Sequence, residues 1–360
     1  MSTQFPIIEL SGTPRMQGRG HGEALRDAIA RVREQWRESL TLRFGVHPDE
    51  FIEAFLAQTS FVDAMRRWTP RLLEEIEGIA EGSGRPLQET LAFQFMDEEW
   101  WFGTMRYPRK RDTPNHCSVI ACRARAGSAA ILGQNMDLRA YHDGGQAMIV
   151  ISESGAPRAT VLTICGMIGL CGANEAGVGV AVNTLWQLPS AADGLPVACV
   201  MREILATRSV AEAGEWIRTP RHASGQHYMI GDPASFASFE ASATLVNAVP
   251  WPEPSPAFVH TNHPIDSTRI RRDEENSRNR YTTLCGLASG KTLTLEEVKS
   301  ALSIGAGSDP ISVRPKPDDP ASAMTFASIV MELKRPPAIQ VAGGPPCSNP
   351  YRAIETFHAW

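Results

Sequence analysis

The sequence predicts an α+β protein with helices and strands in separate layers, and two observations support this prediction. The first third of the chain has the apolar spacing of amphipathic helices, whereas short β-branched runs dominate from Cys117 onward. These strands follow one another in pairs, with helical segments after them. Such an order favours a layered αββα arrangement over a doubly wound parallel sheet.

The helical signal is clearest over residues 20–45. Leu25, Ile29, Val32 and Trp36 recur at the spacing of one helix face, and Gly45 suits a C-terminal cap. The pattern continues over residues 48–68, so this part of the chain is expected to be a set of packed helices.

A further helix is expected to begin at Pro70, with Thr69 as its N-cap and a glycine at its end. Another is expected from Pro86 towards Trp100. The polar, proline-containing stretch Met105–His116 is expected to form a surface loop that separates the helices from the strands.

After the loop, strands are expected in two groups that are separated by helices. Strands are predicted over 117–122, 128–136, 146–154, 158–166 and 169–186, then over 226–232, 235–242, 256–264 and 325–333. Helices are predicted over 197–217 and 294–305, and residues 312–322 are expected to form a loop.

The composition excludes several classes of function. The formal net charge is −5, which argues against nucleic acid or an anionic membrane surface as a partner. No window approaches 18 consecutive apolar residues, and no secretory signal is visible at the N-terminus. The cysteine count is seven, an odd number. Reduced thiols in a cytoplasmic protein are therefore expected.

Cys117 is the residue that most strongly suggests chemistry, although a buried structural thiol is the alternative. It follows a polar loop and begins a β run. Cleavage of the His116–Cys117 bond would make it a chain terminus, and a free α-amine has a pKa of about 7.7–8.0, suited to a general base. One residue would then supply both the nucleophile and its base.

The chain resembles the acyl-coenzyme A:isopenicillin N (6-aminopenicillanic acid) acyltransferase family of N-terminal-nucleophile (Ntn) cysteine hydrolases. It is more distantly similar to bile-salt hydrolases and penicillin V acylases. Several segments carry the resemblance in the family's order: GHGEAL (20–25), the nucleophile Cys117, GQNMD (133–137), GANEAGVGVAVNTL (172–185), VHTNHP (259–264) and, more weakly, SRNRY (277–281) and TFASIVM (325–331).

The resemblance implies a role for each matched residue. Cys117 would attack the substrate carbonyl and form a thioester. Asp137 would orient the new α-amine, with a turn-closing aspartate as the alternative. Asn262 would donate its side-chain amide to the oxyanion, with Asn183 as a second oxyanion candidate. Arg280 would organise the site, with a surface helical arginine as the alternative.

The same resemblance implies a four-layer αββα Ntn fold and a cut chain. Residues 1–116 would become a small helical α subunit around a catalytic β subunit of residues 117–360. The two pieces would remain together as an αβ heterodimer, and the reaction would need neither a metal nor an organic cofactor.

Two further interpretations concern residues near these motifs. His116, Cys117, Cys122, His260 and His263 are possible metal ligands, but their spacings match no common zinc site.

An acidic stretch precedes two tryptophans at the end of the predicted helical region. Asp97, Glu98, Glu99 and Trp100 form either a solvated helix end or part of a substrate pocket. As a pocket, they would suit an amine-bearing or aromatic substrate, because an anion stabilises a desolvated ammonium.

The expected reaction is hydrolysis of the C–N amide bond of a small N-acyl amine or amino-acid derivative. Penicillin acyltransferases carry an arginine before the late strand, where Ala321, Ser322 and Ala323 stand here, so one anchor for an anionic partner is missing. Acidic residues in the pocket would also repel the phosphates of coenzyme A. The alternatives are an acyl-CoA-dependent N-acyltransferase and an uncleaved, non-catalytic binding protein.

Overall fold

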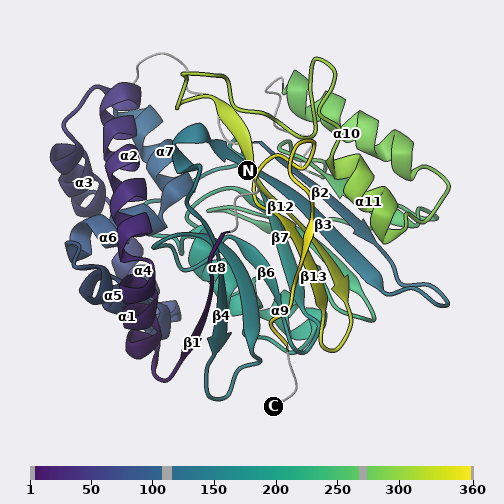
Figure 1. Ribbon diagram of the computed structural model, residues 1–360, viewed down its shortest axis with the longest axis horizontal. Helices are drawn as coiled ribbons and strands as arrows, with labels where there is room; N and C mark the ends of the chain where they lie inside the picture. The colour runs from purple at the N-terminus through teal and green to yellow at the C-terminus, as the bar shows by residue number, and fades with distance from the viewer. Residues whose placement is uncertain (1–4, 108–115, 267–273, 358–360) are drawn as a thin grey trace.

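The computed structural model describes residues 5–107, 116–266 and 274–357, which form two β-sheets with helices around them (Figure 1). The helices are α1 (Pro14–Ala24), α2 (Arg26–Phe44), α3 (Pro48–Ala57), α4 (Phe61–Trp68), α5 (Pro70–Ser83), α6 (Leu87–Gln94), α7 (Met96–Arg106), α8 (Val197–Ile204), α9 (Val210–Trp216), α10 (Glu275–Ala288) and α11 (Leu295–Leu302).

The strands of the described residues fall into one sheet of eight and one of six. The eight-stranded sheet runs β1 (Ile7–Ser11), β4 (Gln146–Ser152), β5 (Ala159–Ile164), β6 (Cys171–Asn174), β7 (Gly179–Thr184), β8 (Gln226–Gly231), β9 (Phe236–Ala241) and β10 (Val246–Ala248). The six-stranded sheet runs β11 (Ala257–His260), β2 (Cys117–Cys122), β3 (Ala130–Arg139), β12 (Ala323–Leu333), β13 (Ala338–Ala342) and β14 (Arg352–Ile354).

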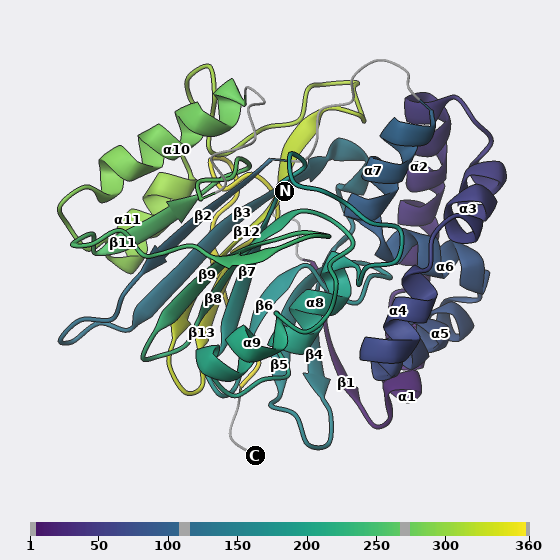
Figure 2. The ribbon, with the colours of Figure 1, turned by 180° about the vertical axis from the view of Figure 1, so that it is seen from behind.

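The two sheets pack face to face, with β2 and β3 against β7. Helices α10 and α11 cover the outer face of the six-stranded sheet, and α9 packs on β8 and β9 of the other sheet (Figure 2). Helices α1 to α7 gather beside the edge that carries β1 (Figure 1). This arrangement confirms the predicted α+β class and its αββα layers.

The helical region follows the predicted pattern with two differences. The four predicted apolar positions are buried, namely Leu25, Ile29, Val32 and Trp36. Gly45 adopts the left-handed cap with φ 67°, but the helix breaks at Leu25 into α1 and α2. Thr69 precedes α5 as predicted, yet its side chain makes no capping hydrogen bond, so that part of the prediction was wrong. No helix within the described ranges is long and apolar enough to cross a bilayer.

The N-terminal segment also contributes a strand that the sequence did not reveal. β1 pairs in parallel with β4, with Ile7 opposite Met148. The other pairs of named strands within the described residues are antiparallel, so this edge differs from the rest of the two sheets. Because of this pairing, the N-terminal segment is part of the same sheet as the later strands. The predicted loop Met105–His116 lies largely outside the described residues, and α7 includes its first two residues.

The GQNMD segment lies on β3 and connects three layers. Gly133 allows α11 to approach closely, since a Cβ there would lie 2.8 Å from Val298 Cγ1. The Gln134 side chain points to the other sheet and bonds both backbone groups of Val182. Asn135 donates to the carbonyls of Leu302 and Ile311 on the helical side. This alternation follows from the two-residue period of a strand.

Strand register then determines which residues meet Cys117. Cys117 pairs with Met136 on β3, so Asp137 lies one step further along, beside His116. On the other side, His260 of β11 pairs with Val119. Because the strands are antiparallel, two further residues along that chain place Asn262 level with Cys117.

Candidate active site

The peptide bond between His116 and Cys117 is hydrogen-bonded on both sides. The carbonyl oxygen of His116 accepts from the backbone N–H of Asp137 at 2.9 Å. The backbone N–H of Cys117 donates to Oδ1 of Asn262 at 2.6 Å. The bond is therefore held in one orientation between two strands, next to the thiol of its own second residue.

Arg280, on α10, lies fully buried over this bond. Its guanidinium donates to the carbonyl oxygen of Cys117 and to Oγ of Ser118, both at 2.8 Å, and to Oδ1 of Asn262 at 2.9 Å. The same nitrogen that donates to Asn262, Nη2, lies 3.4 Å from Nδ1 of His116. The structure thus places Arg280 in contact with both sides of the predicted cleavage point and not on the surface.

The side chain of Asn262 has one orientation that satisfies its neighbours. Cys117 and Arg280 both offer N–H donors, so the oxygen faces them, and Nδ2 donates to the carbonyl of Thr184 at 3.1 Å. Its backbone N–H donates to Oγ of Ser277. An amide nitrogen carries two hydrogens, and Thr184 accepts one, so the second remains available as a donor.

Asp137 is buried with an unequal environment at its two carboxylate oxygens. Oδ1 accepts from Oγ1 of Thr325 at 2.6 Å, whereas Oδ2 has no partner among the described residues. Burial raises the pKa of Asp137 to about 7, and the hydrogen bond from Thr325 and the charge of Arg280 oppose that rise. The Oδ2 atom can therefore accept a hydrogen bond from a further N–H donor.

The thiol of Cys117 is not activated in the uncut chain. Burial raises its pKa to about 12, and the negative charge of Asp137 adds to the rise, while the Asp137 backbone N–H and Arg280 oppose it. A nearby α-ammonium group would stabilise the thiolate and lower this pKa. The thiol is therefore protonated at neutral pH in this structure.

A small cavity adjoins Cys117, with room for about 30 Å³, roughly one or two water molecules. Its walls are mostly apolar and rich in methionine. The lining residues are Gln94, Met96, Asp97, Cys117, Met136, Leu138, Met167, Gly169, Leu170, Val182, Thr184, Val197, Ala198 and Met201. Methionine side chains are flexible, so such walls suit an apolar group of variable shape.

Of the acidic stretch, Asp97 lines this cavity. Its carboxylate accepts from Thr184 Oγ1 and from Gln226 Nε2, and burial raises its pKa. Glu98 is also buried, but it bonds the N–H of Val197 and Oγ of Ser224, and burial raises its pKa to about 7.

Glu99 and Trp100 are turned away from the cavity lining. Glu99 accepts from Nε1 of Trp36 and pairs with Arg43 at 2.7 Å. Trp100 packs edge-on against Trp186 with ring centroids 6.4 Å apart. Neither residue belongs to the cavity lining, so their predicted substrate contact stays a prediction without geometric support.

Asn183 is likewise separate from the lining. Its neighbours on β7, Val182 and Thr184, face the cavity, so the Asn183 side chain points the other way and bonds His227 at 2.8 Å. Its Nδ2 atom is buried without a partner among the described residues. An oxyanion role for this side chain stays a prediction.

The alternative metal ligands are not brought together. Cys122 lies at the far end of β2 from Cys117, and His260 bonds Glu240 and the carbonyl of Thr261. Across residues 5–107, 116–266 and 274–357, no group of three or more His, Cys, Asp or Glu could hold a metal ion.

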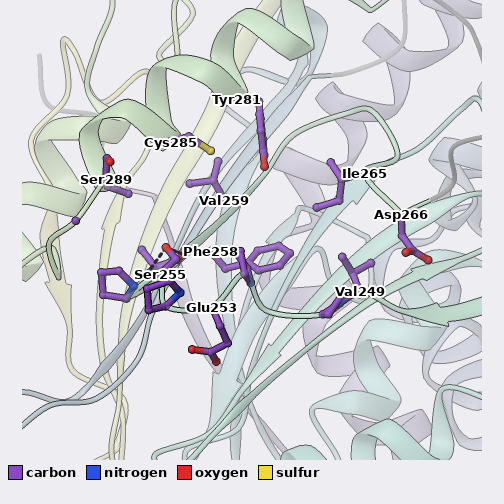
Figure 3. Close-up of a pocket in the computed structure, with 17 residues that line it drawn as sticks. Val249, Glu253, Ser255, Phe258, Val259, Ile265, Asp266, Tyr281, Cys285 and Ser289 are labelled. Atoms are coloured by element: carbon purple, nitrogen blue, oxygen red, sulfur yellow. Dashed lines mark hydrogen bonds between the residues drawn. The ribbon is translucent and has the colours of Figure 1, made fainter.

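A second cavity, of about 600 Å³, is bounded by the proline-rich segment 249–256, by β11 and by α10 (Figure 3). Tyr281 and Cys285 point into it from the helix, and Glu253 and Asp266 are among its acidic lining residues. Cys117 is not part of its lining. The larger volume of this cavity is therefore no reason to place the site there, because the cavity does not reach Cys117.

Comparison with known proteins identifies the family. Residues 124–343 match the family described as acyl-coenzyme A:6-aminopenicillanic acid acyl-transferase, which is more than half of the chain. The chain belongs to this acyltransferase family. It is also 28% identical over 258 residues to the 40 kDa form of acyl-coenzyme A:6-aminopenicillanic-acid-acyltransferase from Emericella nidulans, covering 71% of this chain and 68% of the relative.

Solved structures similar to this acyltransferase-family chain include a mutant of conjugated bile acid hydrolase from Clostridium perfringens, with 16% identity and a TM-score of 0.48 over 66% of this chain and 92% of that one. Penicillin V acylase from Agrobacterium tumefaciens has 15% identity and a TM-score of 0.44, over 63% and 83%. At these scores the assignment rests on the family match.

Membership of the acyltransferase family makes the protein an enzyme that transfers acyl groups or hydrolyses carbon–nitrogen bonds. The predicted resemblance to this family is confirmed. Sequence reasoning missed Thr325 as the partner of Asp137, and Ser277 as the support of Asn262. Ser277 lies in the weaker motif SRNRY and Thr325 in TFASIVM. The resemblance therefore marked both segments but gave neither residue a role.

Asp137→Asn is expected to slow both chain cleavage and turnover in this family member, because one side chain orients the same atoms in both steps. It should also stabilise the fold at neutral pH. The pKa of Asp137 is raised from 3.8 to about 7 in the folded state, so the folded wild type loses stability as pH rises through that window. The asparagine variant does not ionise and escapes this loss of up to about 4 kcal/mol.

The measurement is urea unfolding at pH 4 and pH 8 in the uncut Cys117→Ala background, with and without the Asp137→Asn substitution. The matched control is Asp63→Asn, where the carboxylate is exposed on α4. Equal pH dependence with either residue at position 137 would contradict the buried-acid interpretation. Normal cleavage and turnover would reduce Asp137 to a structural residue.

Proposed function

We propose that this protein is a self-cleaving Ntn cysteine amidohydrolase that acts on a small N-acyl amine or amino-acid derivative through a thioester at Cys117. One observation carries the proposal. The His116–Cys117 bond is hydrogen-bonded at its carbonyl by Asp137 and at its nitrogen by Asn262, beside the Cys117 thiol. A peptide bond in an ordinary strand has no such combination of a nucleophile and side-chain contacts.

In the first step, the thiol adds to the carbonyl carbon of His116 through a five-membered ring. The negative charge that develops on the oxygen is stabilised by the Asp137 N–H already bonded to it. The C–N bond then breaks, the thiol proton goes to the nitrogen, and a thioester remains. Water hydrolyses this thioester, which yields a carboxylate at His116, a free thiol and the α-amine of Cys117.

In the catalytic cycle, the α-amine takes the thiol proton as the sulfur adds to the substrate amide carbon. Asn262 donates its second amide hydrogen to the oxyanion, and Arg280 holds the Asn262 oxygen in place. The leaving amine receives the proton as the C–N bond breaks. Water then adds to the thioester and releases the acid. Oδ2 of Asp137 orients the amine throughout.

The cavity supports this choice of substrate. Four methionines, Met96, Met136, Met167 and Met201, provide apolar walls for an acyl group. Asp97 provides one carboxylate next to Cys117, which favours an amine and disfavours the phosphates of coenzyme A. Residues 1–116 and 117–360 would remain together as α and β subunits.

Arg139 favours a second candidate, the acyl-CoA-dependent N-acyltransferase. The sequence lacks an arginine before β12, but the guanidinium of Arg139 reaches that position and donates to the carbonyl of Ala321 at 2.8 Å. It also lies close enough to His116 to help lower the pKa of that imidazole to about 3, after burial and Arg280. A cation therefore lies near the site, and a thioester accepts either water or an amine.

The test is a panel of N-acyl amines and amino-acid amides, incubated with and without phenylacetyl-coenzyme A and an acceptor amine. Hydrolysis of at least one amide, at a rate that the acceptor does not raise, is the expected result. Efficient transfer from phenylacetyl-coenzyme A with negligible amide hydrolysis would establish the transferase. Arg139→Gln should then weaken coenzyme A binding.

A further inference from the structure

A buried turn forms one wall of the Cys117 cavity, and side chains from three helices hold its conformation. It comprises residues 165–170 between β5 and β6, and Met167, Gly169 and Leu170 line the cavity. All six residues are buried, and Gly166 has φ 87°, a conformation that favours glycine. A buried turn needs partners for its backbone polar groups, and side chains supply those at Gly166 and Ile168.

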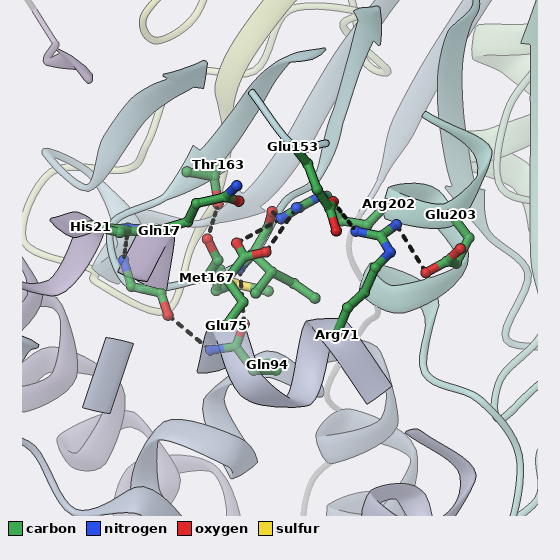
Figure 4. Close-up of polar contacts among 12 residues, drawn as sticks. Gln17, His21, Arg71, Glu75, Gln94, Glu153, Thr163, Met167, Arg202 and Glu203 are labelled. Atoms are coloured by element: carbon green, nitrogen blue, oxygen red, sulfur yellow. Dashed lines mark hydrogen bonds and ion pairs between the residues drawn. The ribbon is translucent and has the colours of Figure 1, made fainter. Parts of the chain in front are cut away.

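Gln94, at the end of α6, contacts the turn at two points (Figure 4). Its Nε2 donates to the carbonyl of Gly166 at 2.8 Å, and its Oε1 accepts from the N–H of Ile168 at 2.9 Å. A single amide thus bridges two backbone groups, and it sets the distance between them. Gln94 also lines the cavity itself.

His21, on α1, contacts the same glycine, Gly166, at its backbone N–H. The N–H of Gly166 donates to Nε2 of His21 at 3.0 Å. Burial, and then the charges of Arg202 and Arg33, lower the pKa of His21 to about 3. The ring is therefore neutral and its Nε2 is available as an acceptor. This gives a physical role to the GHGEAL segment, which the proposed chemistry does not use.

Arg202, on α8, is a third side chain that contacts the turn, and it belongs to the part of the chain after Cys117. It donates to the carbonyl of Ile168 at 2.8 Å, and it forms a two-bond ion pair with Glu75 of α5, at 2.8 Å for each bond (Figure 4). Both side chains are almost fully buried. The guanidinium is therefore fixed by a helix of the N-terminal segment while it holds the turn.

We propose that His21, Gln94 and the Glu75–Arg202 pair are positioning residues that set the shape of the 165–170 turn, so that the N-terminal segment determines which acyl groups fit beside Cys117. This inference deepens the proposed function and rests on it. The proposed role requires no contact between these side chains and the reacting atoms. Their effect is on the wall that the acyl group meets, so selectivity between acyl chains should change more than self-cleavage.

The test compares Gln94→Met with Gln17→Met. Methionine has a similar length to glutamine but makes no such hydrogen bonds. Gln17 is the matched control, because it is a buried glutamine on α1 that donates to a backbone carbonyl of the later chain, Ser152, which does not line the cavity. Both variants should cleave themselves normally.

The probes are 4-nitroanilides with acetyl, butyryl, hexanoyl and phenylacetyl groups, and N-alkyl iodoacetamides of graded chain length. The ratio of kcat/KM between long and short acyl groups, and the ratio of Cys117 alkylation rates, should each shift about tenfold in Gln94→Met and less than twofold in Gln17→Met. His21→Gln, which keeps an acceptor, should resemble wild type more closely than His21→Phe.

Equal shifts in both glutamine variants, or no shift in Gln94→Met, would overturn the inference. Failure of the proposed function gives a different result, namely an uncut wild-type chain with no anilide turnover. The alkylation ratios would then still report whether Gln94 shapes the wall. Thermal unfolding of each variant shows whether it is folded, and His21→Gln provides the second test if Gln94→Met is not.

Discussion

Wild-type protein is expected to separate into two copurifying fragments, residues 1–116 and 117–360, whereas Cys117→Ala should remain one chain of 360 residues. Alanine has no thiol to add to the His116 carbonyl, so the first bond of the proposed reaction does not form. The effect is a complete loss of cleavage and of amide turnover. Intact mass spectrometry under denaturing conditions measures it directly.

Cys122→Ala is the matched control, because Cys122 belongs to the same strand and is also buried, and burial raises the pKa of both thiols to about 12. It should cleave like wild type. The two thiols differ in their neighbours and not in their intrinsic acidity, since the contacts with Asn262 and Asp137 are made at Cys117. A wild-type chain that stays uncut after prolonged incubation would refute the catalytic proposal.

Asn262→Ala is expected to lower kcat per cleaved chain by about 10²–10³, the usual effect of removing one oxyanion donor. KM should change much less, because the interaction is strongest in the transition state. The same variant should cleave itself more slowly, since Oδ1 of Asn262 holds the Cys117 nitrogen before cleavage. Initial rates, divided by the cleaved fraction from mass spectrometry, give the comparison.

Asn174→Ala separates loss of the donor from loss of a buried amide. Asn174 is fully buried and donates to the carbonyls of Leu205 and Thr207, and it is not among the residues that line the cavity at Cys117. This variant is expected to unfold at a lower temperature and yet to keep its kcat. Wild-type turnover in Asn262→Ala would instead show that the oxyanion is stabilised elsewhere.

Sequence motifs named Cys117, Asp137, Asn262 and Arg280, which the structure brings together, because a local motif fixes both residue type and backbone position. GQNMD is one strand, and its alternation sets which side chains face each layer. What brings Asn262 level with Cys117 is the register of β11 on β2, a pairing of segments about 140 positions apart. No local pattern specifies that register, so only the order of the motifs was available.

The acidic stretch shows a limit of a different kind. Asp97, Glu98 and Glu99 are consecutive on α7, and each step turns the side chain by about 100° around the axis. Composition treats the three as equivalent, whereas the helix directs one to the cavity, one to Ser224 and one to Arg43. The phase of a helix depends on what it packs against, and that is tertiary information.

The parallel pairing of β1 with β4 has a consequence for how the protein returns from denaturant. Before cleavage, the strand and its sheet are on one polypeptide, so refolding is first order. After the proposed cleavage, residues 1–116 and 117–360 would have to associate in solution, and their recovery would follow mass action. Refolding yield of the mature protein should therefore rise with concentration, while that of Cys117→Ala should not. The proposed cleavage would thus make refolding inefficient in dilute solution.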